Sequence, residues 1–511
     1  MSYYLGLDNG GTTTKATIYD NRGKEMGTHS METRTIVVRT DFVERDMEEM
    51  WEANCAVIRE VLQKTNIAGS EIACVAICGH GKGLYLWGKD NKPVRNGIIS
   101  TDNRAWEYPV RWKSDGTEDK LFALTCQHIL ACQPVSLLCW LRDHEPEALQ
   151  NIQWVFEAKD YVRFRLTGEA RAELTDYSGS GLLNLHTRSF DPVILELLGI
   201  PEIWPALPPL CNSTDICGAV SGEAAQKTGL PKGTPVAGGM FDINACALAV
   251  DVLDEEHLCM IAGTWSINEF IRKSPVLDGS VLMNSIFCLP EYYLVEESSP
   301  TSAGNNEWFI QNLLPELAAA QKQGGKSIYD IANEWVASVP AEEYCPVFLP
   351  FLMASNVHPN AKACFVGMST HHTRAHIMRS VYEGIVFSHK YHLNKLLAAK
   401  DTPTSTIRLA GGVARSRVWT QIFADAVQMP VETVEVNETG TLGCAIVAAV
   451  AAGEYATVRD AAARMCRIGE ACMPDPGKAE IYEKKYQLYL KSIEALDSLW
   501  DTFAQITQSG S

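Results

Sequence analysis

The first thirty residues alternate between short apolar segments and turn residues, which is typical of a β-meander. Residues 3–8 (YYLGLD) and 13–19 (TTKATIY) are rich in aromatic, aliphatic and β-branched side chains. The stretch DNRG at 20–23 is a turn signal, and a third strand follows at 24–30. This pattern predicts three antiparallel strands joined by tight turns.

The next segments add a helix and a buried strand. Between 47 and 62, apolar residues recur at helical spacing. The run IACVAIC at 72–78 has no polar residue, as expected of a strand that is covered on both faces. Strands and helices continue to mix along the chain, so the sequence predicts an α/β protein.

A second region has a similar design. Residues 235–250 (PVAGGMFDINACALAV) predict a strand, a glycine pair, Asp242 and a helix of small residues. Residues 257–270 (HLCMIAGTWSINEF) predict a strand, a Gly-Thr turn and another strand, as at the N-terminus. We interpret this as a weak internal repeat. A chain of 511 residues also exceeds one average core, so we expect two domains, 1–246 and 247–511.

Composition narrows the class of protein. The net charge of −18 argues against a nucleic-acid binder, which would carry a basic face. No apolar run approaches the ~20 residues of a membrane span, and no secretory signal is visible. The sixteen cysteines include no CxxC pair, and the Cys126–Cys132 and His371–His376 clusters lack zinc-ligand spacing. We therefore expect a cytoplasmic protein with reduced thiols and no membrane or nucleic-acid partner.

The turn after the first strand, DNGGTTTK at 8–15, is a candidate phosphate site. A Rossmann fingerprint would continue into a helix, but β-branched residues follow here, and the Walker A spacing is absent. A glycine-tipped hairpin remains, whose backbone N–H groups and threonine hydroxyls could face a phosphate and whose Asp8 could face a cation. An ordinary hairpin with a flexible tip is the alternative.

Two later segments could complete such a site. Gly263 and Thr264 form a second small turn, which could hold a polyphosphate from the other side. RLAGGVARSRVWTQIFAD at 408–425 predicts a strand, the Gly411-Gly412 turn and a helix, and its glycines would let a flat nucleoside ring approach the backbone. ETGTLGCA at 438–445 starts a helix of small residues that can pack tightly behind the site.

These motifs together resemble those of the FGGY carbohydrate kinases, of the actin/hexokinase/Hsp70-like ATPase superfamily. The matching stretches are DNGGTTTK, KDYVRFRLTG at 159–168, GGMFDINACAL at 238–248, AGTWS, AGGVARSRVWTQIFADAVQMPV and ETGTLGCA. They span nearly the whole chain in the family's order, and the xylulose kinases, the L-xylulose branch in particular, look most similar. The resemblance implies two ribonuclease-H-like domains flanking a deep cleft, with the sugar on the first domain and ATP mainly on the second.

The resemblance also implies roles for individual residues. Asp242 matches the catalytic base that accepts the proton of the sugar hydroxyl, although an aspartate at a helix start could instead be an N-cap. Asp8 matches the Mg²⁺-associated aspartate. The residues that match phosphate or nucleoside contacts are Thr12, Thr13, Lys15, Gly263, Thr264, Gly411, Gly412 and Arg415.

The sugar contacts follow the buried strand. Gly81 and Lys82 stand where xylulokinases carry a Met-His pair, so Lys82 either binds sugar hydroxyls or is a solvated loop lysine. The Arg-Glu pair of glycerol kinases is absent from this loop. Asp102 and Arg104 resemble an aspartate–x–arginine segment that contacts the sugar, with a simple surface ion pair as the alternative.

The sequence therefore predicts an ATP- and Mg²⁺-dependent kinase of a ketopentose, D- or L-xylulose first, which forms xylulose 5-phosphate. Ribulose or another polyol is an alternative substrate, and the family suggests a homodimer. An ATP-dependent switch or binding protein of the same superfamily is the alternative from another class.

Overall fold

The computed structural model describes residues 2–263, 265–322, 324–435 and 437–508, which form two units. The first unit holds the described residues of 1–253, 271–295 and 436–467, and the second holds those of 254–270, 296–435 and 468–511. The chain thus passes between the units several times. A single domain boundary near residue 246 remains a prediction.

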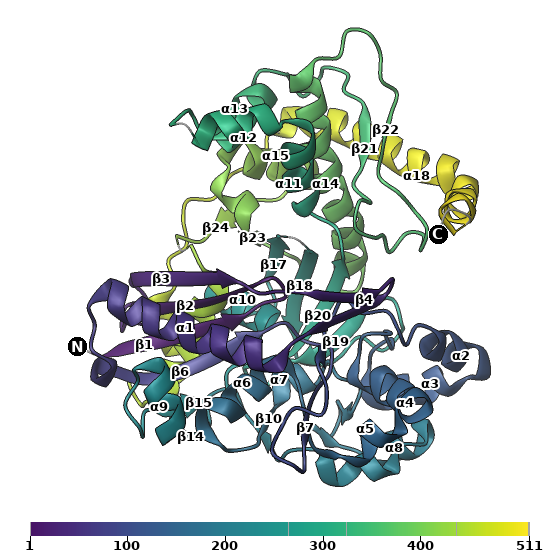
Figure 1. Cartoon of the computed structure of the whole chain (residues 1–511). Coiled ribbons are helices and arrows are strands. Elements are labelled where there is room, and N and C mark those ends of the chain that lie inside the picture. The colour runs from purple at the N-terminus through teal and green to yellow at the C-terminus, as the bar shows by residue number, and fades with distance from the viewer. Residues whose placement is uncertain (1, 264, 323, 436, 509–511) are drawn as a thin grey trace. The chain divides into compact units, whose positions relative to one another are not determined.

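The first unit is built on a mixed sheet (Figure 1). Its strand order is β14-β15-β6-β1-β2-β3, and β16 also pairs with β6. β1, β2 and β3 are antiparallel neighbours, which confirms the predicted meander, while β6 runs parallel to β1, β15 and β16. The strands are β1 (Tyr3–Asn9), β2 (Thr13–Asp20), β3 (Glu25–Glu32), β6 (Ile72–Gly79), β14 (Ile216–Ala219), β15 (Pro235–Ala237) and β16 (Met240–Phe241).

Alternate residues of β1 face opposite sides of this sheet. Leu5 and Leu7 pack into the core formed with α1 (Met47–Thr65), the helix that the apolar spacing predicts. Gly6 faces α16 (Thr439–Ala451), where a Cβ atom would lie 2.1 Å from the carbonyl oxygen of Thr441. The missing side chain lets α16 lie directly against the strand.

The helix α10 (Asp242–Ala249) is in equally close contact with α16. A Cβ atom on Gly443 would lie 2.2 Å from the carbonyl oxygen of Ala245, and the Cys246 thiol lies 3.3 Å from the Thr439 hydroxyl. The small residues of both helices permit this approach, so the starts of α10 and α16 are held together.

The rest of the first unit forms a second apolar core and short sheets. Its helices are α2 (Glu107–Asp115), α3 (Thr117–Thr125), α4 (Pro134–His144), α5 (Pro146–Gln150), α6 (Ala158–Thr167), α7 (Leu174–Tyr177), α8 (Pro192–Leu198), α9 (Gly222–Thr228) and α17 (Val458–Met465). Its short strands are β4 (Ile36–Arg39), β5 (Phe42–Arg45), β7 (Tyr85–Gly88), β8 (Gly97–Ile98), β9 (Ile152–Phe156), β10 (Ala172–Glu173), β11 (Leu183–Asn184), β12 (Ser189–Phe190), β13 (Leu210–Cys211) and β19 (Met283–Ile286).

The second unit has its own sheet, which includes the order β20-β18-β17-β23-β24. β17 and β18 form the second predicted hairpin, and β23 runs parallel to β17. These strands are β17 (His257–Ala262), β18 (Ser266–Arg272), β20 (Tyr293–Ser299), β23 (Thr406–Ala410) and β24 (Val431–Thr433), and β21 (Val347–Leu349) pairs with β22 (Cys364–Val366).

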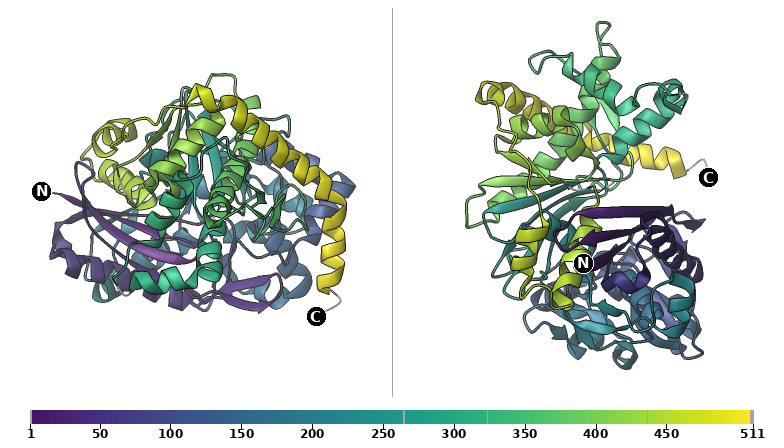
Figure 2. Two further views of the ribbon diagram at one scale, coloured as in Figure 1. Left: turned by 90° about the horizontal axis from the view of Figure 1, so that it is seen from above. Right: turned by 90° about the vertical axis from the view of Figure 1, so that its left-hand side faces the viewer.

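The helices of the second unit pack around this sheet. They are α11 (Gly304–Leu313), α12 (Pro315–Lys322), α13 (Ile328–Ala337), α14 (Arg374–Ala398), α15 (Arg417–Val427) and α18 (Ala479–Gln508). The last is the long helix drawn in yellow in Figure 2. Among the residues described, none of the helices is long and apolar enough to span a membrane.

Candidate active site

The tip between β1 and β2 is a four-residue turn. Asn9 pairs with Thr14 across the strands, and the Gly10 N–H donates to the carbonyl oxygen of Thr13 at 3.1 Å. The Thr12 side chain is exposed and Thr13 is half-buried. The guanidinium of the buried Arg45 donates to the carbonyl oxygens of Gly10 and Gly11. Arg45, which the sequence patterns did not single out, therefore anchors the predicted phosphate turn.

Asp8 and Lys15 are cross-strand neighbours just below this tip. Burial raises the pKa of the Asp8 carboxyl to about 6, although the Lys15 charge opposes this rise. Lys15 Nζ lies 2.8 Å from Oε2 of Glu438, the residue before α16, and this contact raises the pKa of Lys15 against the effect of burial. Lys15 thus has an anionic partner within the protein.

The catalytic candidate Asp242 lies at the same edge of the sheet as Asp8. Cys78 of β6 pairs with Asp8 on one side and with Met240 on the other. Asp242 follows two residues later as the first residue of α10, where it is half-buried. The N-cap position is Phe241, and the Asp242 carboxylate accepts a hydrogen bond from the Ile243 N–H at 2.8 Å in the first turn of the helix.

The loop after β6 carries the predicted acceptor residues. The buried His80 Nε2 lies 2.9 Å from the Tyr85 hydroxyl, and burial lowers the pKa of His80 to about 3, so the ring is neutral at physiological pH. A Cβ atom on Gly81 would lie 2.5 Å from the Phe241 ring and 2.9 Å from Oδ1 of Asp176. Glycine is therefore needed where the loop meets the residue before Asp242.

Lys82 has a strained backbone, with φ at +65°. Its side chain is half-buried, and Nζ lies 5.5 Å from the centre of the Phe241 ring. Lys82 therefore lies beside Phe241, the residue before Asp242, and is not fully solvated.

Asp102 and Arg104 form a buried ion pair rather than a surface one. The Asp102 carboxylate accepts hydrogen bonds from the Val43 N–H at 2.6 Å and from the N–H and Nε of Arg104, both at 2.9 Å. Arg104 also lies 2.9 Å from Glu44, which binds Arg95. These contacts hold the loop that contains residues 99–104 against β5. A contact of Asp102 or Arg104 with a sugar remains a prediction.

The second unit brings its predicted residues together in the same way. Gly263 follows β17, and Gly411 and Gly412 follow the neighbouring strand β23. Gly411 has φ at +93°, and a Cβ atom there would lie 2.5 Å from the carbonyl oxygen of Ala262. Apart from the chain neighbours, no atom of the described residues lies within 4 Å of the Cβ positions of Gly263 and Gly412, and Arg415 is exposed nearby on the same turn. Thr264 lies outside the described residues.

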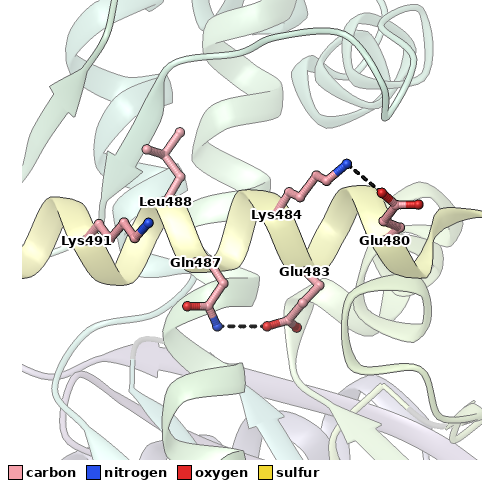
Figure 3. A pocket seen from close by; sticks show the side chains of 6 residues that line it. All are labelled: Glu480, Glu483, Lys484, Gln487, Leu488 and Lys491. Carbon is pink, nitrogen blue, oxygen red and sulfur yellow. Dashed lines mark hydrogen bonds and ion pairs between the residues drawn. The ribbon is translucent and has the colours of Figure 1, made fainter.

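A pocket is also present on the surface of α18 in the second unit. Figure 3 shows a shallow pocket along α18, lined by exposed side chains that include the Lys484–Glu480 ion pair. None of the predicted site residues lines it. We assign this pocket no role in the chemistry.

Comparison with known proteins matches the chain to two consecutive family domains. Models of the FGGY family of carbohydrate kinases match residues 3–249 with the N-terminal domain and residues 258–452 with the C-terminal domain. The chain belongs to the FGGY family of carbohydrate kinases. This family transfers phosphate from ATP to a sugar, which confirms the predicted enzyme class.

Two relatives match this carbohydrate kinase over nearly its whole length. It is 39% identical to the L-xylulose/3-keto-L-gulonate kinase of Escherichia coli K12, over 97% of both chains. It is 36% identical to the probable L-xylulose kinase of Pasteurella multocida, over 98% of this chain and all of that one. The xylulose kinase of Lactobacillus acidophilus has a similar structure, with a TM-score of 0.87, 24% identity and coverage of 98% and 100%. The predicted ribonuclease-H-like fold class is thereby confirmed.

Proposed function

We propose that this carbohydrate kinase phosphorylates a ketopentose, and that L-xylulose is its preferred acceptor. The 39% identity to the L-xylulose/3-keto-L-gulonate kinase carries this proposal, since it extends over 97% of both chains. The preference for one pentulose over another depends on hydrogen bonds to individual hydroxyl groups.

Asp242 would be the general base. Its carboxylate begins a helix at the sheet edge that also carries Asp8, and the loop with Lys82 reaches the same edge. A ketopentose hydroxyl bound there would give its proton to Asp242 as the oxygen attacks the γ-phosphorus of ATP. The anionic carboxylate also orients that hydroxyl before the transfer.

The phosphates of ATP would bind the glycine-rich tips. Thr12 and Thr13 offer hydroxyl groups at the first tip. The Lys15 ammonium group could bind a phosphate as well as Glu438, or in place of Glu438. Gly263 and Thr264 form the second tip in this proposal. Gly411, Gly412 and Arg415 would contact the nucleoside, because no described atom lies within 4 Å of the Cβ position of Gly412 and a flat ring could approach the backbone there.

The residues around Asp8 suit a magnesium ion held mainly by phosphate. Among the described positions, no group of three or more His, Cys, Asp or Glu residues could hold a metal by itself. Magnesium commonly uses one or two carboxylates together with substrate phosphates, and Asp8 can supply such a carboxylate. When bound, the ion would neutralise phosphate charge.

We also propose that the protein is cytoplasmic, which the cysteine usage supports, and that it forms a homodimer, which the family resemblance supports.

An ADP-release assay with a panel of acceptors tests the function. We expect L-xylulose to stimulate ADP release more strongly than D-xylulose, D-ribulose, L-ribulose and glycerol at equal concentration. An ATP-dependent switch protein would instead hydrolyse ATP slowly, with no stimulation by any sugar. That result would refute the proposal.

A further inference from the structure

Glu157 is a buried acidic residue whose carboxyl group makes no hydrogen bond within the described part of the chain. It follows β9 and has no exposed surface. It occupies the N-cap position of α6, yet its side chain does not cap the helix. Among the described residues, neither carboxyl oxygen has a hydrogen-bond partner. Burying such a group is costly, so a carboxyl that is retained in this state indicates a function.

Two further buried polar side chains also lack hydrogen-bond partners among the described residues. Both are in or beside the loop after β6 that contains His80, Gly81 and Lys82, called the acceptor loop here. Both oxygens of the buried Asp176 lack a hydrogen bond within the described part of the chain, and only Lys159 Nζ lies near, at 3.6 Å. The Nδ1 atom of His80 also lacks a partner among these residues. Asp176 reaches the loop directly, since its Oδ1 lies 2.9 Å from the Cβ position of Gly81.

Electrostatic contacts connect these groups to the catalytic edge. The charges of Asp176 and Lys82 both act on Glu157, and the charge of Asp242 acts on Asp176. Lys82 lies over the ring of Phe241, the residue before Asp242. The polar groups that lack hydrogen bonds are therefore linked to the loop that we expect to hold the acceptor: His80 belongs to it, Asp176 lies beside Gly81, and Glu157 interacts electrostatically with Lys82.

We infer that Glu157 and Asp176 bind hydroxyl groups of the acceptor sugar and determine which ketose fits. This inference rests on the proposed function, because it assigns two residues to the acceptor site of that reaction. A polyhydroxy ketose is the ligand whose chemistry suits them, since each hydroxyl can both donate to and accept from a carboxyl group. Burial raises the pKa of both carboxyls well above the ordinary range, so each can keep a proton and also donate.

Substitution of Glu157 by methionine tests the inference in the full-length enzyme. We expect Glu157→Met to raise KM for L-xylulose about tenfold or more, as for one hydrogen bond lost in a buried site. KM for ATP should stay unchanged, and the Tm should stay the same or rise, because a buried group without partners is removed. Asp176→Asn should likewise raise KM for the sugar and leave KM for ATP unchanged.

The same substitution at Glu383 is a matched control. Glu383 is also buried, but its carboxylate binds Arg379 Nε at 2.7 Å and Lys485 Nζ at 3.0 Å. Glu383→Met should lower the Tm by several degrees and leave KM for L-xylulose unchanged. Opposite effects on Tm and KM at two buried glutamates would separate binding from folding.

Deoxy analogues of the ketose identify the hydroxyl that Glu157 binds. We expect one deoxy analogue to bind the wild type poorly and to bind Glu157→Met as well as the parent sugar does.

Wild-type KM values for every ketose in a folded Glu157→Met variant would overturn the inference. If Glu157→Met does not fold, Glu157→Gln gives the same comparison, and failure of both to fold would mark Glu157 as structural. If the wild type phosphorylates no ketose, the proposed function itself fails.

Discussion

At the scale of single residues, Asp242 is the side chain on which the proposed phosphoryl transfer depends most. We expect Asp242→Asn to lower kcat for L-xylulose by about 10²–10⁴-fold, because an amide cannot accept the hydroxyl proton. The affinity for ATP should remain nearly intact, since the side chain is not a predicted nucleotide contact. Steady-state kinetics and equilibrium binding of ATP measure the two effects. Asp119→Asn, at an exposed position of α3, is the control.

Lys15 and Glu438 give a second test at this scale. If Lys15 binds a phosphate of ATP, as proposed, their 2.8 Å contact means that ATP competes with a carboxylate for the lysine. Lys15→Met should raise KM for ATP, whereas Glu438→Gln should lower it by releasing the ammonium group. Shifts of KM in the same direction for both variants would contradict a phosphate role for Lys15.

The predicted site residues were those that stand in recognisable patterns. Asp8, Lys15 and Asp242 lie beside glycine-rich turns, and the structure brings them to one edge of one sheet. Arg45 and Glu438 could not be predicted, since an arginine that binds carbonyl oxygens and a carboxylate that pairs with a distant lysine have no local pattern. Glu157 directly precedes the KDYVRFRLTG motif, but only the structure shows that it is buried without a hydrogen bond.

At the scale of secondary-structure elements, the contact of α10 with α16 is the main structural support of the site. Gly443→Ala would place a Cβ atom 2.2 Å from the Ala245 carbonyl oxygen, so we expect a loss of about 1–3 kcal/mol in the free energy of unfolding. Urea denaturation measures the loss. The control is Gly222→Ala in α9, where the nearest atom lies 4.0 Å away and no loss is expected.

Glu44 of β5, which binds Arg104, should make the free energy of unfolding depend on pH. Burial would raise the pKa of Glu44, but hydrogen bonds and charge contacts with Arg104 and Arg95 outweigh it and lower that pKa below 4.5. The stabilising effect of Glu44 is therefore full above pH 4.5 and is lost as the pH falls through the folded-state pKa.

Glu44→Gln should accordingly be less stable than the wild type at neutral pH, by about 1–3 kcal/mol. The difference should shrink as the pH falls below 4.5. Urea unfolding of both proteins across this range measures it. A difference that stays constant with pH would show that Glu44 does not act through its charge.

The meander, the two hairpins and the main helices could be predicted from apolar spacing and turn residues. The packing partner of α16 could not be predicted. Its small residues indicate that the helix packs closely against something, but they do not show which strand it contacts. Its partner is Gly6, more than 400 residues earlier, and this contact joins residues 439–451 to the first unit. Contacts between residues so distant in sequence lie beyond local patterns.

At the scale of the whole molecule, each unit contains some of the residues that we propose for phosphoryl transfer. The first holds the proposed base, phosphate turn and acceptor loop, and the second holds the glycine turns proposed for the nucleotide. The net charge of −18 means that local N–H groups and lysines, rather than the overall field, must attract ATP.

The most direct test is identification of the product formed from ATP and L-xylulose. We expect phosphorus NMR and mass spectrometry to show one phosphate transferred per ADP formed, attached to the C5 oxygen of the ketose. ADP that forms with inorganic phosphate, at a rate that L-xylulose and the other pentuloses leave unchanged, would contradict the account.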